Sequence, residues 1–393
     1  MRSGSLVFGV RHDRGRRVRA GTPGHSGGTV HADGSRGTGL LRDLARMVVV
    51  LSEAEDLRSF TLPYPGMAQR ALDRTVAHCL DIGETPPTSL PELWEWCRHR
   101  TADDRLFDGP ASLVAPGATL VDAHGRMPTR TCLELAAHGP DGVATEARVL
   151  LRDLAARSGT AARFQRCRLF LARNPVVRQD DRHRRSSGWD RVVWSLVKEL
   201  YQPVPEFLRV QGVFPCCRSC RLPALPGDRR APLAGPGASR VDVWCEGEDC
   251  PRDTELEAVR KPQLSLVLRR SLRVFLVLPH RTEEDVLSRL DAAGIAHQSV
   301  PDHLNAFHVR GAVLKNTGVR VYDRLQPGLL AARLADSPPI ADRTLVAVPP
   351  RLAERPGYRA AFTAALPETA RERLVLTTPD ELVHHLGEGA ASA

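Results

Sequence analysis

The fold class of the chain is decided by residues 271–300, SLRVFLVLPHRTEEDVLSRLDAAGIAHQSV. The apolar run Leu272–Leu278 predicts a buried strand, Glu283–Ala293 has the spacing of a helix, and Ile295–Val300 predicts a second strand. The same alternation continues to the end of the chain. We expect strands over Phe307–Val309, Val319–Tyr322, Thr344–Val348 and Leu374–Thr377, and helices over Gly328–Leu334, Gly357–Leu366 and Asp380–Leu386. Strands and helices that alternate at this spacing predict an α/β layer with a mixed sheet.

The chain before this stretch has a helical pattern instead. Leu40, Leu44 and Met47 begin an apolar stripe with helical spacing. Val143–Ala156 and Ala161–Ala172 predict a pair of helices, because both keep that spacing and Asn174-Pro175 ends the second. Trp189–Tyr201 predicts a further amphipathic helix, whose inward positions are Val192, Val193, Leu196, Val197 and Leu200.

Nine cysteines are present, and four of them form two closely spaced pairs. Cys217 and Cys220 are separated by two residues, whereas Cys245 and Cys250 are separated by four. A polar loop rich in Pro and Gly joins the pairs, which is the arrangement of a structural zinc ribbon. We therefore expect structural Zn²⁺ on Cys217, Cys220, Cys245 and Cys250, with Cys216 as a spare or as an alternative first ligand. The alternative is a set of reduced thiols without metal, because the second pair is spaced more widely.

The 393 residues predict two or three domains. The chain is expected to be an α+β protein with a disordered basic arm (1–38), a helical domain (39–210), a zinc-ribbon-like insert (211–262) and an α/β domain (263–393). The longest apolar runs are too short to cross a bilayer, and the first residues lack a secretory signal. We therefore expect a cytoplasmic protein with no membrane partner.

The formal net charge is +9, and arginine supplies nearly all of the positive charge. Guanidinium groups make bidentate contacts with phosphate, so the surplus favours a nucleic-acid partner. The alternative is a solvated surface whose arginine content follows codon usage. The densest basic stretch after residue 38 is a loop whose candidate phosphate contacts are Arg178, Arg182, Arg184 and Arg185. A solvated linker neutralised by Asp180, Asp181 and Asp190 is the other interpretation of this loop.

An α/β run of this kind can be an endonuclease core of the PD-(D/E)xK type, in which two carboxylates hold Mg²⁺ and a lysine assists the attacking water. Pro301-Asp302 supplies the first part of the motif. The second part is missing, because the residues two positions before the three lysines are Leu196, Val259 and Val313. The complete motif therefore does not occur in the chain.

From Ala161 to its end the sequence resembles the restriction-endonuclease-like proteins that accompany pPIWI-RE proteins, which are prokaryotic Argonaute relatives, in a three-gene defence system with a helicase. The resemblance rests on the order of several short segments rather than on any one of them. These segments are residues 166–171, 174–175, 201–205, the cysteine pairs, 273–279, 323–332, 346–349 and 355–358. It implies a restriction-endonuclease-like fold for residues 263–393, with DNA, a PIWI-like protein and a helicase as partners.

The resemblance also implies where the catalytic residues of such a nuclease would fall. The acidic residue of the helix matches Glu283 or Glu284, but the strand aspartate falls on His308. The aspartate and the lysine of the last triplet fall on Arg320 and Tyr322, respectively. An arginine at a ligand position repels the metal, so the family pattern implies a degenerate centre.

A shifted register leaves an alternative in which Asp302 and Asp323 supply two carboxylates and Arg324 supplies the cation. Mg²⁺ is expected only in that case, and whether the protein is an enzyme stays open. We expect a nuclease-fold DNA-binding subunit of a pPIWI-RE-type system. The alternatives are a non-catalytic adaptor, or a zinc-ribbon nucleic-acid-binding protein unconnected with defence.

Overall fold

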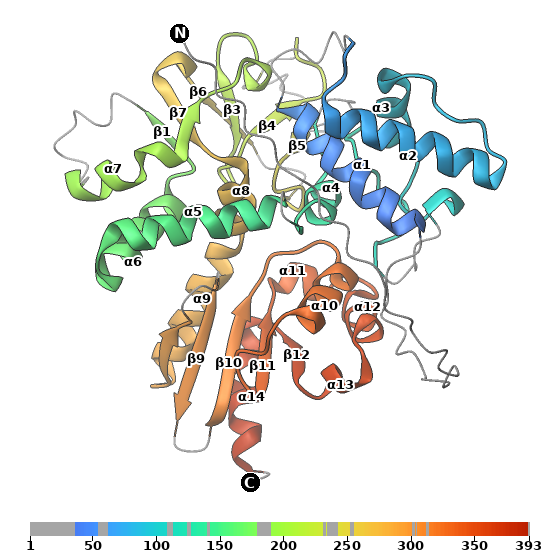
Figure 1. Cartoon of the computed structure of the whole chain (residues 1–393). Helices are drawn as coiled ribbons and strands as arrows, with labels where there is room; N and C mark the ends of the chain where they lie inside the picture. The colour runs from blue at the N-terminus through green and yellow to red at the C-terminus, as the bar shows by residue number, and fades with distance from the viewer. Residues whose placement is uncertain are drawn as a thin grey trace, which may run out of the picture. The chain divides into compact units, whose positions relative to one another are not determined.

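The computed structural model is drawn in Figure 1. It describes residues 36–53, 62–107, 113–123, 127–139, 142–178, 190–230, 233, 243–251, 255–300, 303, 305–311 and 314–391. The predicted arm therefore lies almost wholly outside the described residues, and the helix expected from Leu40 begins at Arg36. Within these ranges no helix is both long and apolar enough to cross a membrane.

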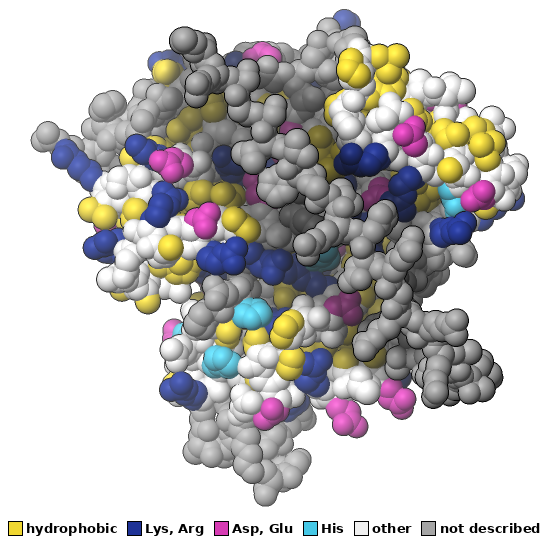
Figure 2. Space-filling model, in the orientation of Figure 1, with side chains coloured by type: hydrophobic (Ala, Val, Ile, Leu, Met, Phe, Trp, Pro, Cys, Tyr) yellow, Lys and Arg dark blue, Asp and Glu magenta, His cyan; other side chains and the backbone are white. Residues whose placement is uncertain are grey.

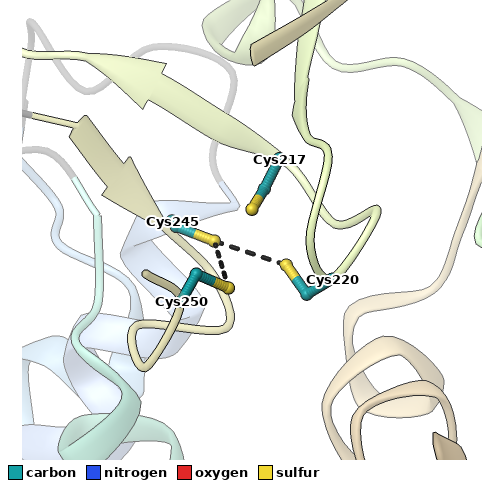
Figure 3. Close-up of side chains that lie close together, drawn as sticks. All are labelled: Cys217, Cys220, Cys245 and Cys250. Atoms are coloured by element: carbon teal, nitrogen blue, oxygen red, sulfur yellow. Dashed lines mark hydrogen bonds between the residues drawn. The ribbon is translucent and has the colours of Figure 1, made fainter. Parts of the chain in front are cut away.

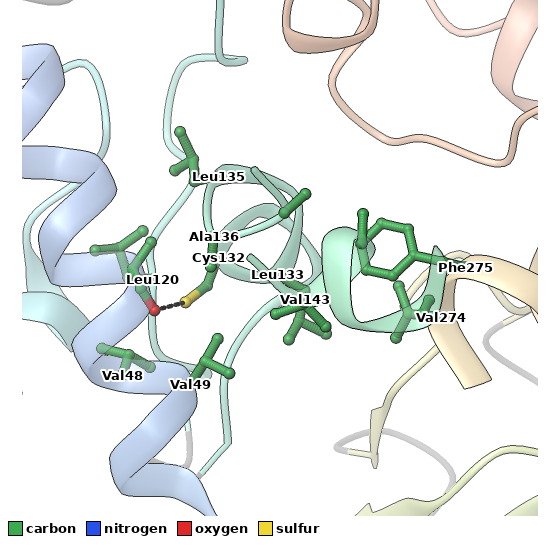
Figure 4. Close-up of a cluster of buried hydrophobic side chains, with 14 of the residues drawn as sticks. Val48, Val49, Leu120, Cys132, Leu133, Leu135, Ala136, Val143, Val274 and Phe275 are labelled. Atoms are coloured by element: carbon green, nitrogen blue, oxygen red, sulfur yellow. Dashed lines mark hydrogen bonds between the residues drawn. The ribbon is translucent and has the colours of Figure 1, made fainter. Parts of the chain in front are cut away.

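The N-terminal half is helical, as predicted. Its helices are α1 (Arg36–Ser52), α2 (Gly66–Ile82), α3 (Leu90–His99), α4 (Arg130–Leu135), α5 (Val143–Ser158) and α6 (Ala161–Arg173), with a 3₁₀ turn over Arg105–Phe107. Their apolar faces form one core, in which Val48, Leu133 and Val143 pack toward Phe275 from much later in the chain (Figure 4). The Cys132 thiol lies in this core and donates to the Ala45 carbonyl, which supports a packing role for it.

The stretch predicted to be the strand Leu272–Leu278 is helical, so that prediction is wrong. Helix α8 (Arg270–Leu272), a π-helical turn (Arg273–Val277) and α9 (Leu278–Ala292) follow one another without a break, and we call them the central helix. A fully buried helix is apolar on all sides, so its sequence does not differ in pattern from that of a buried strand. The π turn ends two residues before Pro279, which has no N–H to donate to a regular helical ladder.

Three strands join the helical half to the central helix. Strand β7 (Ser265–Leu268) pairs antiparallel with both β1 (Val176–Arg178) and β2 (Tyr201–Pro203). Before β2 come α7 (Arg191–Val197) and a 3₁₀ turn over Lys198–Leu200. The predicted amphipathic helix is thus shorter than expected, and Val192, expected to face inward, is 49% exposed.

The cysteine-rich segment leaves the sheet after β2 and returns to it at β7. It contains two small antiparallel pairs. Strand β3 (Phe214–Cys217) pairs with β6 (Leu256–Val259), and β4 (Ala224–Pro226) pairs with β5 (Val243–Cys245). Turns of 3₁₀ helix over Glu206–Leu208 and Pro262–Leu264 flank these pairs. Strand β3 ends at Cys217 and strand β5 ends at Cys245, so each strand pair leads into one of the two cysteine turns.

The C-terminal region holds the predicted mixed sheet, in the order β12-β11-β10-β9-β8. Strands β8 (Ala296–Ser299), β9 (Ala306–Gly311) and β10 (Leu314–Val321) form an antiparallel meander, and β11 (Arg343–Ala347) and β12 (Leu374–Thr377) continue it in parallel. Apolar side chains of α9 and α14 (Pro379–Ala391) cover one face. The other face packs against α10 (Pro327–Asp336), α11 (Pro350–Ala353) and α12 (Tyr358–Ala365), and α13 (Glu368–Arg371) precedes β12.

Candidate metal centre and arginine-lined cavities

The four predicted cysteine ligands lie together (Figure 3). Their sulfur atoms are all within 4.8 Å of one another. The Cys220 and Cys245 sulfurs are 3.4 Å apart, and those of Cys245 and Cys250 are 3.8 Å apart. Zinc with four thiolates at about 2.3 Å places the sulfur atoms about 3.8 Å apart in a tetrahedron. The donor set and its spacing therefore fit a metal such as zinc, with no position left for a substrate water.

The thiols of the cluster interact strongly with one another. All four are free rather than joined in disulfides. Hydrogen bonds among them, the one with Cys220 first, hold the pKa of Cys217 far below its ordinary value, whereas the hydrogen bond with Cys217 raises the pKa values of Cys220 and Cys245 above theirs. A thiolate is the form that binds metal. Cys216 lies on β3 outside this cluster, and burial raises its pKa to about 12, so it has the character of a packed thiol.

Gly247 is required at the tip of the second cysteine turn. A Cβ atom at this position would lie 3.1 Å from the Cys220 sulfur and 3.3 Å from the Cys250 sulfur. Both distances are closer than ordinary van der Waals contact, and both atoms are metal-ligand candidates. A side chain at residue 247 would therefore require the turn or the two sulfurs to shift by a few tenths of an ångström.

The four residues between Cys245 and Cys250 contact three other parts of the protein. Both carboxylate oxygens of Glu246 accept from Arg273 on the central helix, at 2.6 and 2.7 Å. The Gly247 carbonyl accepts from the Arg130 guanidinium at 3.1 Å, and Glu248 accepts from the Arg130 backbone N–H at 2.6 Å. The wider spacing of the second pair is thus explained by contacts that a two-residue turn has too few residues to make.

The fourth of these residues, Asp249, reaches the C-terminal region. It pairs with Arg351 on α11, with 2.7 Å between the Arg351 Nε and the Asp249 oxygen, and it also pairs with Arg355. Arg351 in turn contacts Asp323, with 2.5 Å between the two side chains. The candidate metal centre is therefore continuous with a chain of ion pairs that ends just after β10.

Asp323 is one of the residual acids considered from sequence, and it is already occupied. It is 2% exposed. Besides Arg351, it accepts from the fully buried Arg130 at 2.9 Å. Arg130 also lies 3.3 Å from Glu134, which accepts from the backbone N–H groups of Leu325 and Gln326. Two guanidinium groups neutralise Asp323, so it is poorly suited to hold Mg²⁺.

The two acidic residues of α9 that were considered from sequence are also paired. Both oxygens of Glu283 accept from Arg168 on α6, at 2.7 and 2.5 Å. Glu284 accepts from Arg173 at 2.6 Å and lies 3.3 Å from His280. The remaining candidate, Asp302, lies outside the described residues. Helix α6 thus covers this acidic end of α9 with arginines.

The three positions expected to be degenerate share one face of the sheet. His308 on β9 pairs in register with Gly318, and Arg320 follows Gly318 by two residues on β10. Alternation along a strand then places Tyr322 on the same face. Arg320 is 4% exposed and donates to the Pro338 carbonyl at 3.0 Å.

Of the four arginines predicted to contact phosphate, only Arg178 can be placed. It ends β1 and lies 3.7 Å from Glu257 on β6. Arg182, Arg184 and Arg185 lie outside the described residues. The loop therefore stays a prediction.

Two cavities that share lining residues were not predicted from sequence. The larger, of about 780 Å³, lies between α5–α6 and the β8–β9 end of the sheet. The smaller, of about 100 Å³, is lined by Arg148, Arg320, Arg324 and Arg333, and we call it the arginine cavity. Figure 2 shows basic side chains in a band along α5, above the strands of the sheet. Arg148 precedes the other three arginines by at least 172 residues, so only the fold brings it beside them.

Comparison with known proteins finds a family match for one part of the chain. Residues 40–178 match the family model described as pPIWI_RE three-gene island domain Y. Searches of curated proteins and of solved structures found no match. The match associates the chain with pPIWI-RE systems, as the resemblance implies, but it covers the helical half and β1. The endonuclease-like character of residues 263–393 therefore stays a prediction.

Proposed function

We propose that this pPIWI-RE-associated chain is a nuclease-fold subunit of a three-gene defence system, which binds DNA and does not cut it. A PIWI-like protein and a helicase are its expected partners. The association with pPIWI-RE systems speaks against the alternative of a zinc-ribbon protein unconnected with defence. The non-catalytic adaptor remains the second candidate, and it differs in having no DNA affinity of its own.

The order of elements after the central helix supports the nuclease-fold part of the proposal. A helix (α9), a three-stranded antiparallel meander (β8 to β10), a helix (α10) and a parallel strand (β11) follow one another. The edge where β10 and β11 end is also where open α/β sheets bind their ligands. This edge carries Arg320, Tyr322 and Asp323.

The proposal that the protein does not cleave DNA is supported mainly by the pairing of its candidate acidic residues with arginines. Glu283, Glu284 and Asp323 each contact at least one arginine at 3.2 Å or less. Mg²⁺ needs carboxylate oxygens that are free to bind it. Among the described residues near this edge of the sheet, no aspartate or glutamate considered from sequence is without a guanidinium partner.

We propose structural zinc for the cysteine cluster, because the four thiols can fill a tetrahedron and the insert has little apolar core of its own. Elemental analysis should find one zinc ion per chain. Each Cys→Ser change at residues 217, 220, 245 or 250 should lower that content, whereas Cys216→Ser should leave it unchanged. Protein that is folded, intact at its cysteines and free of metal would refute the zinc assignment.

Restoring the nuclease residues tests the register and the fold together. The variant His308→Asp, Arg320→Asp, Tyr322→Lys should gain Mg²⁺-dependent cleavage of duplex DNA that the natural chain lacks. The matched control is His308→Asp, Arg320→Asp alone, which has the carboxylates without the lysine and should be much less active. A triple variant that stays folded and bound to DNA but does not cut would contradict the proposed register.

A further inference from the structure

We infer that the arginine cavity is a binding site for a phosphomonoester group, such as the terminal phosphate of a nucleic-acid strand or the phosphate of a mononucleotide. The inference deepens the proposed function, because it names the group by which the nucleic acid would be recognised. It rests on an excess of buried positive charge that the described residues leave uncompensated.

The arginines of this cavity are not paired with carboxylates. Arg148 donates to Thr145, Arg320 to the Pro338 carbonyl, and Arg333 contacts the His138 ring at 3.2 Å. The guanidinium of Arg324 lies 4.1 Å above the Phe275 ring. None of these partners carries a negative charge. In the part of the chain that the structure describes, no ion pair is formed by Arg148, Arg320, Arg324 or Arg333.

One carboxylate lines the arginine cavity, but it does not neutralise the charge of the four arginines. Asp323 is held by Arg130 and Arg351, which lie outside the cavity lining. Glu134 attracts Arg324 electrostatically, yet its oxygens accept from two backbone N–H groups and one of them lies 3.3 Å from Arg130. Each nearby acid is therefore already committed to other donors.

The buried arginines repel one another. Burial lowers the pKa of Arg324 to about 10; the charge of Glu134 opposes this shift, and the charges of Arg333 and Arg130 add to it. Arg324 is 9% exposed and Arg320 is 4% exposed. The Nε atom of Arg320 is buried without an acceptor among the described residues. Buried charges without partners destabilise a protein, so an anion with several acceptor oxygens would relieve both the repulsion and the missing hydrogen bonds.

The shape of the site favours a terminal phosphate over an internal one. The arginine cavity, of about 100 Å³, adjoins the larger cavity through the shared lining residues Arg148, His303 and Asn305. A dianionic phosphomonoester offers three terminal oxygens to fork-shaped donors. The larger cavity, of about 780 Å³ and lined in part by Phe164 and Phe307, has room for the sugar and base attached to that phosphate.

Fluorescence anisotropy with the zinc-loaded full chain tests the inference. Short single-stranded DNA with a 5′-phosphate, the same DNA with a 3′-phosphate, and the same DNA with hydroxyl ends would be compared. We expect one phosphorylated form to bind roughly tenfold more tightly than the hydroxyl form, as one charge-assisted contact supplies about 1.4 kcal/mol or more. Equal affinity for all three forms would overturn the inference.

Two variants and one control assign the effect to the cavity. Arg324→Gln removes a buried guanidinium. Arg148→Glu reverses an exposed charge at the rim of the arginine cavity, and this variant keeps the test valid if Arg324→Gln fails to fold. Both should abolish the preference for phosphate. The control, Arg157→Gln, changes an arginine that lies on α5 like Arg148 but does not line the cavity, so this variant should retain the preference for phosphate. A preference that survives Arg148→Glu in folded protein would contradict the site.

Calorimetry with a nucleoside 5′-monophosphate separates the inference from the proposed function. Saturable binding that Arg148→Glu abolishes, without binding of any DNA strand, would support the phosphate site and refute the DNA-binding function. Tight DNA binding that is indifferent to terminal phosphate would support the function and refute the site. Absence of both kinds of binding would refute both.

Discussion

Arg130 shows how a single residue holds separate parts of this protein together. Its side chain is completely buried, and its guanidinium contacts Asp323, Glu134 and the Gly247 carbonyl. Burial opposes its charge, but the adjacent Asp323 and Glu134 raise its pKa above the ordinary value. A charge buried at this depth is stable only with all of these partners.

Replacing Arg130 should therefore be costly. Arg130→Met keeps much of the volume but leaves Asp323 and Glu134 with unmatched buried charge, so the free energy of unfolding should fall by about 3–5 kcal/mol. Urea denaturation followed by circular dichroism measures the change. The control is Arg105→Ala, which removes an exposed ion pair with Glu84 and should cost at most about 1 kcal/mol. Equal costs for the two variants would contradict the network.

His138 should make the protein sensitive to acid. Burial, and then the charge of the nearby Arg333, lowers its pKa from 6.5 to about 2. The unfolded chain binds a proton below pH 6.5 whereas the folded chain does not, so stability falls as the pH decreases below that value. The slope attributable to this group approaches about 1.4 kcal/mol per pH unit. His138→Gln should flatten the stability profile between pH 6.5 and 5, and an unchanged profile would contradict the assignment.

At the scale of elements, the second cysteine turn (residues 245–250) has two structural roles. It supplies two of the four thiols, and its intervening residues bind α4, the central helix and α11 through side-chain and backbone contacts. Gly247 makes both roles compatible, because it lets the turn approach the sulfurs closely.

Gly247→Ala should weaken metal binding for this reason. The new methyl group would press on the Cys220 and Cys250 sulfurs, so we expect metal to be lost at a roughly tenfold lower chelator concentration. Competition with a zinc-sensitive dye measures the loss. Gly39→Ala is the control, since a Cβ there meets only an arginine side chain at 3.6 Å and helix propensity improves. Unaltered metal affinity in Gly247→Ala would show that the turn is more adaptable than the geometry indicates.

The elements differ in how well the sequence predicts them. The strands β11 and β12 are predictable because both are short, rich in apolar residues and bounded by turn residues, and β12 has the predicted limits. Strand β10 begins at Leu314 rather than at Val319, because its first residues are polar. The helix over Leu272–Leu278 is not predictable from the pattern, because continuous burial removes the periodicity that distinguishes a helix from a strand. The cysteine cluster was predictable from local spacing. The arginine cavity was not, because its residues come from four separate segments and carry no local motif.

At the scale of the whole molecule, the cysteine turn connects the family-matched helices to the C-terminal sheet. Removal of the metal should therefore affect more than the insert. Hydrogen exchange after treatment with a chelator should increase in α4 and α11 as well as in β3 to β6, because Arg130 and Arg351 lose ordered partners at residues 247–249. Increased exchange confined to residues 211–262 would contradict this coupling.

The central claim, that the protein binds DNA without cutting it, is tested most directly by one gel-shift experiment. Zinc-loaded full-length protein would be mixed with end-labelled duplex and single-stranded DNA in Mg²⁺, and each sample would be run on native and denaturing gels. We predict a shifted complex that weakens steeply with salt, and full-length DNA after denaturation. Cleaved DNA would contradict the loss of the nuclease centre, and DNA that stays unshifted even at low salt would contradict the binding function itself.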